Sequence, residues 1–194
     1  ASTTLQVDTV TPTLSLTVSG TKGENGFYTS SAAITPTFGD ATSGVDRVEV
    51  SIDGGARQVV TTPVTLSDGL HTYQFSVYDK AGNFTENPVQ QISIDTIPPA
   101  IVLTDRLDLG DTFEYSLQDD GSGLAVVRIV IEDEDERFPK VAWQETISGN
   151  KFKDEFVWDG RWKDKSYAIA GEYFITVKAS DAAGNERISY GVVN

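Results

Sequence analysis

The chain has 194 residues, and its 29 acidic and 15 basic side chains give a formal net charge of −14 at neutral pH. Such an acidic chain repels nucleic acid and anionic lipid, because affinity for phosphate depends on lysine and arginine. It has no cysteine, which excludes disulfides, thiolate nucleophiles and zinc–cysteine sites. No apolar run approaches the roughly 18–20 residues that span a bilayer.

The first half of the chain has the alternating pattern of an antiparallel β-domain. Residues 1–12 are rich in threonine and are predicted to form an extended linker rather than part of a core. Pro36 lies within an apolar stretch, which predicts that part of that strand is at a sheet edge or in a bulge. The Asp-Gly-Gly turn at residues 53–55 predicts a hairpin. Strands are expected over residues 13–18, 33–38, 48–52, 58–60, 71–78 and 89–94.

The second half repeats this order. Its Asp-x-x-Ser-Gly turn at residues 119–123 corresponds to residues 40–44, and its Asp-x-Ala-Gly-Asn turn at residues 181–185 corresponds to residues 79–83. The second half is longer, and the extra length is assigned to an insertion around residues 132–165. Strands are expected over residues 100–103, 112–117, 124–131, 140–147, 151–158, 173–179 and 188–193.

Two copies of one proline-containing segment mark the expected domain boundary. Ile94-Asp95-Thr96-Ile97-Pro98-Pro99 matches Val7-Asp8-Thr9-Val10-Thr11-Pro12. Proline fixes φ and removes a backbone donor, so such a segment does not lie inside a helix or a central strand. The repeat predicts two domains, 1–96 (with the N-terminal linker 1–12) and 97–194, joined by a short proline-rich linker. Seven or so short strands in each half predict an all-β chain of antiparallel sandwiches.

Several motifs of the two halves together indicate a known type of domain. They are the two proline-containing segments, residues 40–45, 51–55 and 78–83 in the first half, and residues 119–124, 158–161, 171–173 and 180–185 in the second. On these motifs, both halves resemble the bacterial extracellular immunoglobulin-like domains that are strung together in surface and secreted proteins. The second half is similar to the immunoglobulin-like domain of flagellar hook-capping proteins, which also recurs in secreted hydrolases. The insertion around residues 132–147 has no counterpart in the short version of the family.

This resemblance implies two tandem antiparallel immunoglobulin-like β-sandwiches in a bacterial protein that is secreted or displayed on the cell surface. The chain starts with Ala-Ser-Thr-Thr and shows neither an initiator methionine nor an apolar signal region. We therefore expect it to be an excerpt of a longer precursor, with neighbouring domains as its first partners.

An acidic cluster is the strongest candidate site. In an immunoglobulin-type sandwich, the incoming chain meets two loops at one end of the domain. The residues expected to converge there in the second domain are Asp95, Asp119, Asp120, Asp181 and Asn185, and a sparser matching set in the first domain is Asp8, Asp40, Asp79 and Asn83. Carboxylates, an amide and backbone carbonyls suit Ca²⁺, which takes 6–8 oxygen ligands. The alternative is that these side chains only cap their turns by bonding nearby backbone amides.

Aromatic residues near the insertion give a second candidate. Trp162 and Tyr167 would bind a carbohydrate if their rings were exposed, because flat aromatic faces stack on sugar rings. The alternative is that the aromatic residues of this region pack in the core, as alternation predicts for Phe156 and Trp158.

An enzyme is not expected. The sole histidine, His71, has no Ser-His-Asp context, and a cysteine nucleophile is absent. The predicted function is a non-catalytic structural or adhesion segment, a spacer or presentation module. The alternative is an accessory ligand-binding module of a secreted hydrolase, with polysaccharide or a surface protein as partner.

Overall fold

The computed structural model of the chain describes residues 6–61, 63–104, 106–133, 141–161, 167 and 171–194. Its regular elements there are all β-strands, so the all-β prediction is confirmed. Over this part of the chain, no helix is long and apolar enough to cross a membrane. The chain divides into two compact units, described separately below: unit 1 comprises Ala1–Lys22 and Gly26–Asp95, and unit 2 comprises Gly23–Asn25 and Thr96–Asn194.

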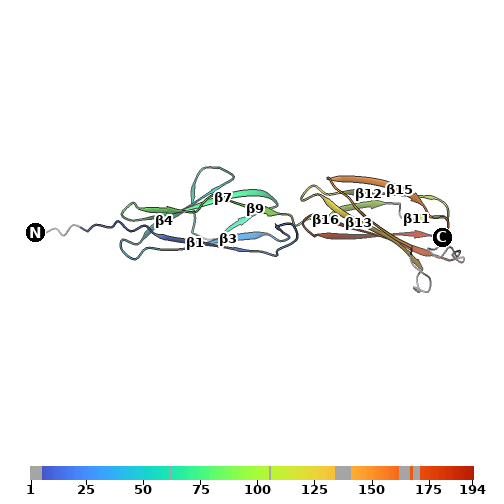
Figure 1. Cartoon of the computed structure of the whole chain (residues 1–194), viewed down its shortest axis with the longest axis horizontal. Coiled ribbons are helices and arrows are strands. Elements are labelled where there is room, and N and C mark those ends of the chain that lie inside the picture. Colours follow the sequence, from blue (N-terminus) through green and yellow to red (C-terminus); the bar gives the residue numbers. More distant parts are fainter. Residues whose placement is uncertain (1–5, 62, 105, 134–140, 162–166, 168–170) are drawn as a thin grey trace, which may run out of the picture. The chain divides into compact units, whose positions relative to one another are not determined.

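Unit 1 is a sandwich of two sheets, drawn in blue to green in Figure 1. The smaller sheet has the order β1–β3–β6, and the larger has the order β2–β9–β7–β4–β5, with β8 paired to β7. Only the β2–β9 pairing is parallel among these strands. The strands are β1 (Thr13–Ser19), β2 (Phe27–Tyr28), β3 (Ala32–Gly39), β4 (Val45–Ile52), β5 (Gln58–Val59), β6 (Val64–Leu66), β7 (Gly69–Asp79), β8 (Phe84–Glu86) and β9 (Gln90–Ile94).

The core of unit 1 lies between these sheets, and β7 supplies much of it. Tyr73, Phe75 and Val77 point inward at alternate positions, and Phe75 and Val77 have no exposed surface. This alternation confirms the half-buried strand predicted over residues 71–78. Strands of both sheets complete the core with Ala32, Ile34, Val48, Val50, Leu66, Ile92 and Ile94.

Pro36 lies at a sheet edge, as its residue type predicts. β3 pairs with β1 along its whole length, whereas its pairing with β6 ends at Ile34. Pro36 therefore has a neighbouring strand on one side only, where it lies opposite Leu16. Its missing N–H is tolerated because no second strand requires it.

The N-terminal linker requires a correction, because residues 8–12 are attached to unit 1. Pro12 is buried, and the Thr85 hydroxyl donates to its carbonyl oxygen at 2.6 Å. The Asn83 side-chain amide donates to the carbonyl oxygens of Asp8 and Val10. Because these backbone oxygens find their donors in and after the turn that follows β7, the stretch belongs to the domain. We call residues 8–12 the lead-in segment.

Unit 2, drawn in yellow to red in Figure 1, repeats the topology of unit 1. Its smaller sheet has the order β10–β12–β15, and its larger sheet has the order β11–β17–β16–β13–β14. As in unit 1, a short strand near the start pairs in parallel with the last strand, here β11 with β17. The strands are β10 (Ala100–Leu103), β11 (Arg106–Leu107), β12 (Thr112–Gln118), β13 (Leu124–Asp133), β14 (Val141–Thr146), β15 (Lys151–Val157), β16 (Tyr173–Asp181) and β17 (Glu186–Val193).

The insertion of unit 2 contributes length to strands as well as to connections. β13, β14 and β15 are each longer than their counterparts β4, β5 and β6. Trp158 follows β15 and is 7% exposed, and its ring meets that of Tyr173 edge to face at 5.1 Å. Phe156 packs against the core, 4.9 Å from Phe113 between ring centroids. The core alternative for Phe156 and Trp158 is thus confirmed.

Candidate functional site

The turn between β3 and β4 is built around one carboxylate. Asp40 Oδ1 accepts backbone N–H bonds from Thr42 (3.1 Å), Ser43 (2.9 Å) and Gly44 (2.8 Å). Gly44 has a φ of 79°, which glycine adopts without steric cost. The Asp-x-x-Ser-Gly spacing therefore wraps a turn around its own first side chain. The other oxygen, Asp40 Oδ2, is buried and has no hydrogen-bond partner among the residues described.

The turn after β7 uses a second carboxylate in the same way. Asp79 is 2% exposed, and its Oδ1 accepts N–H bonds from Ala81 (2.9 Å) and Asn83 (2.8 Å). Asp79 Oδ2 accepts the Asn83 side-chain amide at 2.8 Å. The same amide nitrogen reaches the carbonyl oxygens of Asp8 (3.2 Å) and Val10 (3.3 Å). One asparagine thus joins this turn to the lead-in segment.

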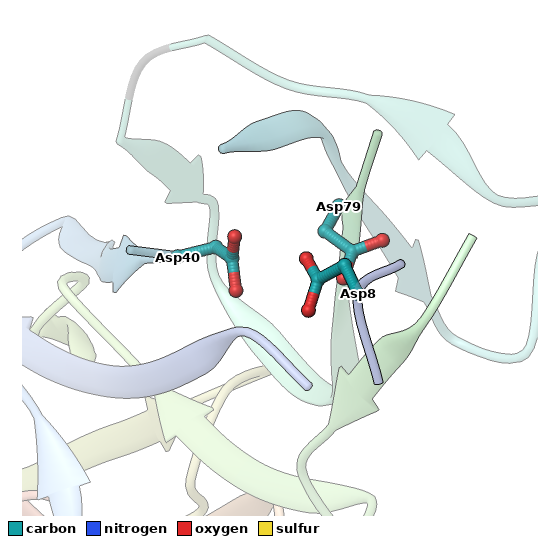
Figure 2. Close-up of side chains that lie close together, drawn as sticks. All are labelled: Asp8, Asp40 and Asp79. Carbon is teal, nitrogen blue, oxygen red and sulfur yellow. The ribbon is translucent and has the colours of Figure 1, made fainter. Parts of the chain in front are cut away.

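The lead-in segment brings a third carboxylate to these turns. Asp8 Oδ1 accepts the N–H of Val10 (2.9 Å), and its Oδ2 accepts the N–H of Ser43 (3.0 Å). Carboxylate oxygens of Asp8, Asp40 and Asp79 all lie within 4.8 Å of one another. Figure 2 shows these side chains converging from the lead-in segment, the end of β3 and the end of β7. We call this group the Asp8 cluster; it is the set predicted for the first domain.

Hydrogen bonding stabilises negative charge in the Asp8 cluster. The pKa of Asp8 is lowered from its ordinary value, first by the Ser43 side chain, then by the backbone N–H of Val10 and least by the backbone N–H of Ser43. Asp8 is therefore ionised at neutral pH, close to two further carboxyl groups. Such a concentration of hard oxygen atoms is the donor chemistry that Ca²⁺ prefers.

The same two turns recur in unit 2 with matching bonds. Asp119 Oδ1 accepts N–H bonds from Gly121 (3.2 Å) and Gly123 (2.7 Å). Asp181 accepts both the backbone N–H and the side-chain amide of Asn185, each at 2.8 Å. Asp119 and Asp181 are 3% and 1% exposed, and a carboxylate oxygen of one lies within 4.8 Å of the other's. Unit 2 thus brings together three of the five residues predicted for the second cation site.

The other two residues of that predicted site are placed differently. Asp120 is exposed, and the Gln118 side-chain amide lies 3.0 Å from each of its carboxylate oxygens. Asp120 does not join the two buried carboxylates. Asp95 is the last residue of unit 1, where it is 1% exposed and its N–H donates to Tyr28 O at 2.9 Å. Its convergence with the carboxylates of unit 2 stays a prediction.

Turn capping accounts for most of these bonds. Asp40, Asp79, Asp119 and Asp181 each accept at least one backbone N–H from their own turn. This is the predicted alternative to a cation site, in which short acidic side chains accept hydrogen bonds from nearby backbone N–H groups. Capping does not explain Asp40 Oδ2, which is buried beside two other carboxylates without a donor. That atom is what distinguishes the Asp8 cluster from an ordinary pair of turns.

Of the two residues predicted to bind carbohydrate, the structure describes Tyr167. Trp162 lies outside the described residues. Tyr167 is 65% exposed, as a binding platform requires. However, the Arg161 guanidinium lies 4.8 Å from the ring centroid and donates to the phenol oxygen at 2.5 Å. The Tyr167 ring is therefore already in contact with a cation.

A second exposed aromatic group, in unit 1, was missed by the sequence reasoning. Arg47 Cζ lies 3.9 Å from the Tyr78 ring centroid, and Phe84 stacks on Tyr78 at 5.6 Å. Phe84 is 51% exposed. Hydrogen bonds to Glu49 and then Asp46 raise the pKa of Arg47 and fix its guanidinium. This aromatic stack (Arg47, Tyr78 and Phe84) depends on the β4–β7–β8 register, which the sequence does not display.

Comparisons with known proteins relate the first domain to one family. Residues 8–96 match the family model described as bacterial Ig-like domain. No curated protein matches the chain. Among solved structures, the chain is similar to the FN1–FN3 domains of chicken CNTN1, at 9% sequence identity and a TM-score of 0.35. That match covers 92% of this chain and 64% of the other, so the chain spans less than two thirds of that structure.

Proposed function

Because residues 8–96 are a bacterial immunoglobulin-like domain, we propose that the chain is a non-catalytic spacer or adhesion segment of a secreted or cell-surface bacterial protein. This fold hosts many functions, so the role has to be argued from particular contacts. The observation that carries the proposal is the attachment of the lead-in segment to unit 1. A spacer has to transmit force between neighbouring domains, and the lead-in segment is where force enters unit 1.

The lead-in bonds distribute such a force over two turns and a strand. Asp8 is bonded to Ser43 in the turn after β3 and to Asn83 in the turn after β7. The Pro12 carbonyl oxygen accepts the Thr85 hydroxyl on β8. A pull on residue 8 therefore loads several hydrogen bonds at once rather than peeling them one by one.

The parallel pairings near the chain ends support the same role. In unit 1, Phe27 and Tyr28 pair with Ser93 and Ile94, and the Asp95 N–H extends this ladder to Tyr28 O. Force that separates the ends of the unit shears these bonds together, because an early strand and the last strand run in the same direction. In unit 2, β11 and β17 form the same kind of parallel pair.

Single-molecule force spectroscopy on the whole chain tests this function. We expect a distinct unfolding event for each unit. Tyr28→Pro, which removes the backbone N–H of β2 that faces β9, should lower the unfolding force of unit 1 and leave that of unit 2 unchanged. If the native chain extends at low force without resolved events, it is not a mechanical spacer.

Cation binding at the Asp8 cluster is a second proposed role, supported by the buried Asp40 Oδ2. Asp40→Asn separates it from capping. The variant keeps the Oδ1 acceptor for the turn, and its new amide faces two carboxylates. In chelator, we expect the variant to melt no lower than the native chain, because hydrogen bonds from the new amide to the neighbouring carboxylates offset the weaker bonds that its oxygen forms with the turn. In 1 mM CaCl₂, the native chain should gain stability that the variant does not.

The size of this gain follows from ligand linkage. A free Ca²⁺ concentration of about 100 times the dissociation constant stabilises the folded domain against unfolding by about 2.7 kcal/mol. For a domain of 60–100 residues this corresponds to roughly 10–20 °C in melting temperature. Equal melting curves in chelator and Ca²⁺ would show that the cluster only caps its turns. Asp120→Asn serves as a matched control, because this exposed residue lies outside the carboxylate groups.

Carbohydrate binding, as an accessory module of a secreted hydrolase, is the alternative function. The aromatic stack adds an exposed ring in unit 1 to the predicted Trp162 and Tyr167. Affinity electrophoresis against neutral polysaccharides tests these sites with Trp162→Ala, Tyr167→Ala and Phe84→Ala. Retention that one of these variants abolishes would favour the binding module. Equal mobility with and without glycan favours the spacer.

A further inference from the structure

His71, the sole histidine of the chain, lies between two hydrogen-bond acceptors. Its Nδ1 is 2.8 Å from Asp53 Oδ2, and its Nε2 is 3.1 Å from the carbonyl oxygen of Ser67. An ionised carboxylate and a backbone carbonyl can only accept. A neutral imidazole carries one N–H and satisfies one of these acceptors, whereas the imidazolium carries two and satisfies both. Both contacts are therefore satisfied together only by a protonated ring.

We infer that His71 is a proton-operated clasp that joins the β4–β5 turn to the β6–β7 turn and releases one of them when its ring becomes neutral. The first turn carries Asp53, whose Oδ1 accepts the Thr72 N–H at 2.8 Å. The second turn carries Ser67 and leads into Gly69, which pairs with Ile94 on the last strand of unit 1. The clasp thus stiffens the end of unit 1 from which the chain leaves.

The charges around the ring favour its protonated form. Hydrogen bonding to Asp53 raises the pKa of His71 above its ordinary value of 6.5, against the opposing effect of burial. The backbone of Ser67 and Asp68 adds to this effect. The cation of the first turn, Arg57, is bonded instead to Glu86 at 2.8 Å and Gln74 at 3.1 Å.

The directions of the pKa shifts of His71 and Asp53 define the pH range over which the clasp is closed. The raised pKa of His71 means that its contribution to stability is complete below pH 6.5 and is lost as the pH rises through the folded-state value. The hydrogen bond from His71 lowers the pKa of Asp53 from 3.8, so that contribution is lost only in stronger acid. The clasp is closed in mildly acidic solution and loosens as the pH rises through the folded-state pKa of His71.

Proton NMR tests this inference directly, because one histidine gives one pair of ring signals. In the untagged chain, we expect His71 to titrate above pH 6.5 and its ring nitrogens to show the imidazolium form at pH 5.5. Asp53→Asn keeps an acceptor for the Thr72 N–H but removes the charge, so the midpoint should fall towards 6.5. A native midpoint at or below 6.5, or one that Asp53→Asn does not move, would overturn the clasp.

A stability measurement tests the release. Between pH 6 and pH 8.5 the melting temperature of unit 1 should fall by about 2 °C more in the native chain than in His71→Gln, the size expected of a partly exposed pair. Subtracting the fall measured for His71→Gln removes the effect of pH on the acidic surface, which both proteins share. Equal falls in the two proteins would show that the ring does not control the two turns.

Discussion

Asn83→Ala is the most informative single change in unit 1, because this side chain joins one turn to the lead-in segment. Its amide donates to Asp79 Oδ2 at 2.8 Å and to the carbonyl oxygens of Asp8 and Val10 at 3.2 and 3.3 Å. A hydrogen bond to a charged acceptor contributes about 1.5–3 kcal/mol, and we count the two longer bonds to neutral carbonyls as one bond of about 0.5–1.5 kcal/mol, because the amide has two protons for three acceptors. The expected loss of stability is therefore about 2–4.5 kcal/mol, because Asp79 Oδ2 and the two carbonyl oxygens all lose this donor.

Urea denaturation measures this loss, provided the two units are followed separately. All three tryptophans (143, 158 and 162) are in unit 2, so their fluorescence reports unit 2, whereas amide NMR signals follow unit 1. Asn83→Ala should lower the midpoint of unit 1 and leave the tryptophan transition in place. The matched variant Asn185→Ala should do the reverse, since its amide holds Asp181 in the same way. A loss below about 0.5 kcal/mol in unit 1 would show that this amide does not stabilise the contact between the turn and the lead-in segment.

Three further substitutions in unit 1 test other parts of the fold by the same denaturation assay. Phe75→Ala removes a ring with no exposed surface, and we expect a loss of about 3–5 kcal/mol. Gly82→Ala places a side chain where no atom lies within 4 Å, so only the φ of 95° opposes it, and a loss of about 1–2 kcal/mol is expected. Arg57→Ala removes the donor that joins Gln74 and Glu86, and should lower the free energy of unfolding by about 1–2 kcal/mol. Unchanged stability would show that these bonds are too exposed to water to stabilise the fold.

Patterns that depend on neighbours in the chain could be predicted from the sequence. Period-two alternation located β7, because each inward residue is followed by an outward one whatever the partner strand. The edge position of Pro36 follows from its missing donor. The turns at Asp40 and Asp79 follow from short-range bonding, in which Oδ1 reaches backbone amides two to four residues away. In each case the energetic reason lies within a few residues.

Features that depend on cross-strand register could not be predicted in this way. Tyr78 meets Arg47 and Phe84 only because β7 pairs with β4 on one side and with β8 on the other. His71 meets Asp53 only because the β4–β5 turn reaches the start of β7. A shift of one residue in either ladder would turn these side chains to the opposite face.

The repeated aspartates are explained by the number of amides that a tight turn leaves without partners. At Asp40, one oxygen accepts three backbone N–H groups, which an asparagine oxygen would hold with weaker, uncharged bonds. Each turn therefore favours a carboxylate for its own local reason. The sandwich topology then places two such turns together, and the lead-in segment adds Asp8. The convergence of like charges is thus a consequence of the fold, and bonds such as that of Ser43 to Asp8 offset its cost. In the proposed cation-binding role, the ion is therefore a ligand of turns that already hold these carboxylates through their own hydrogen bonds.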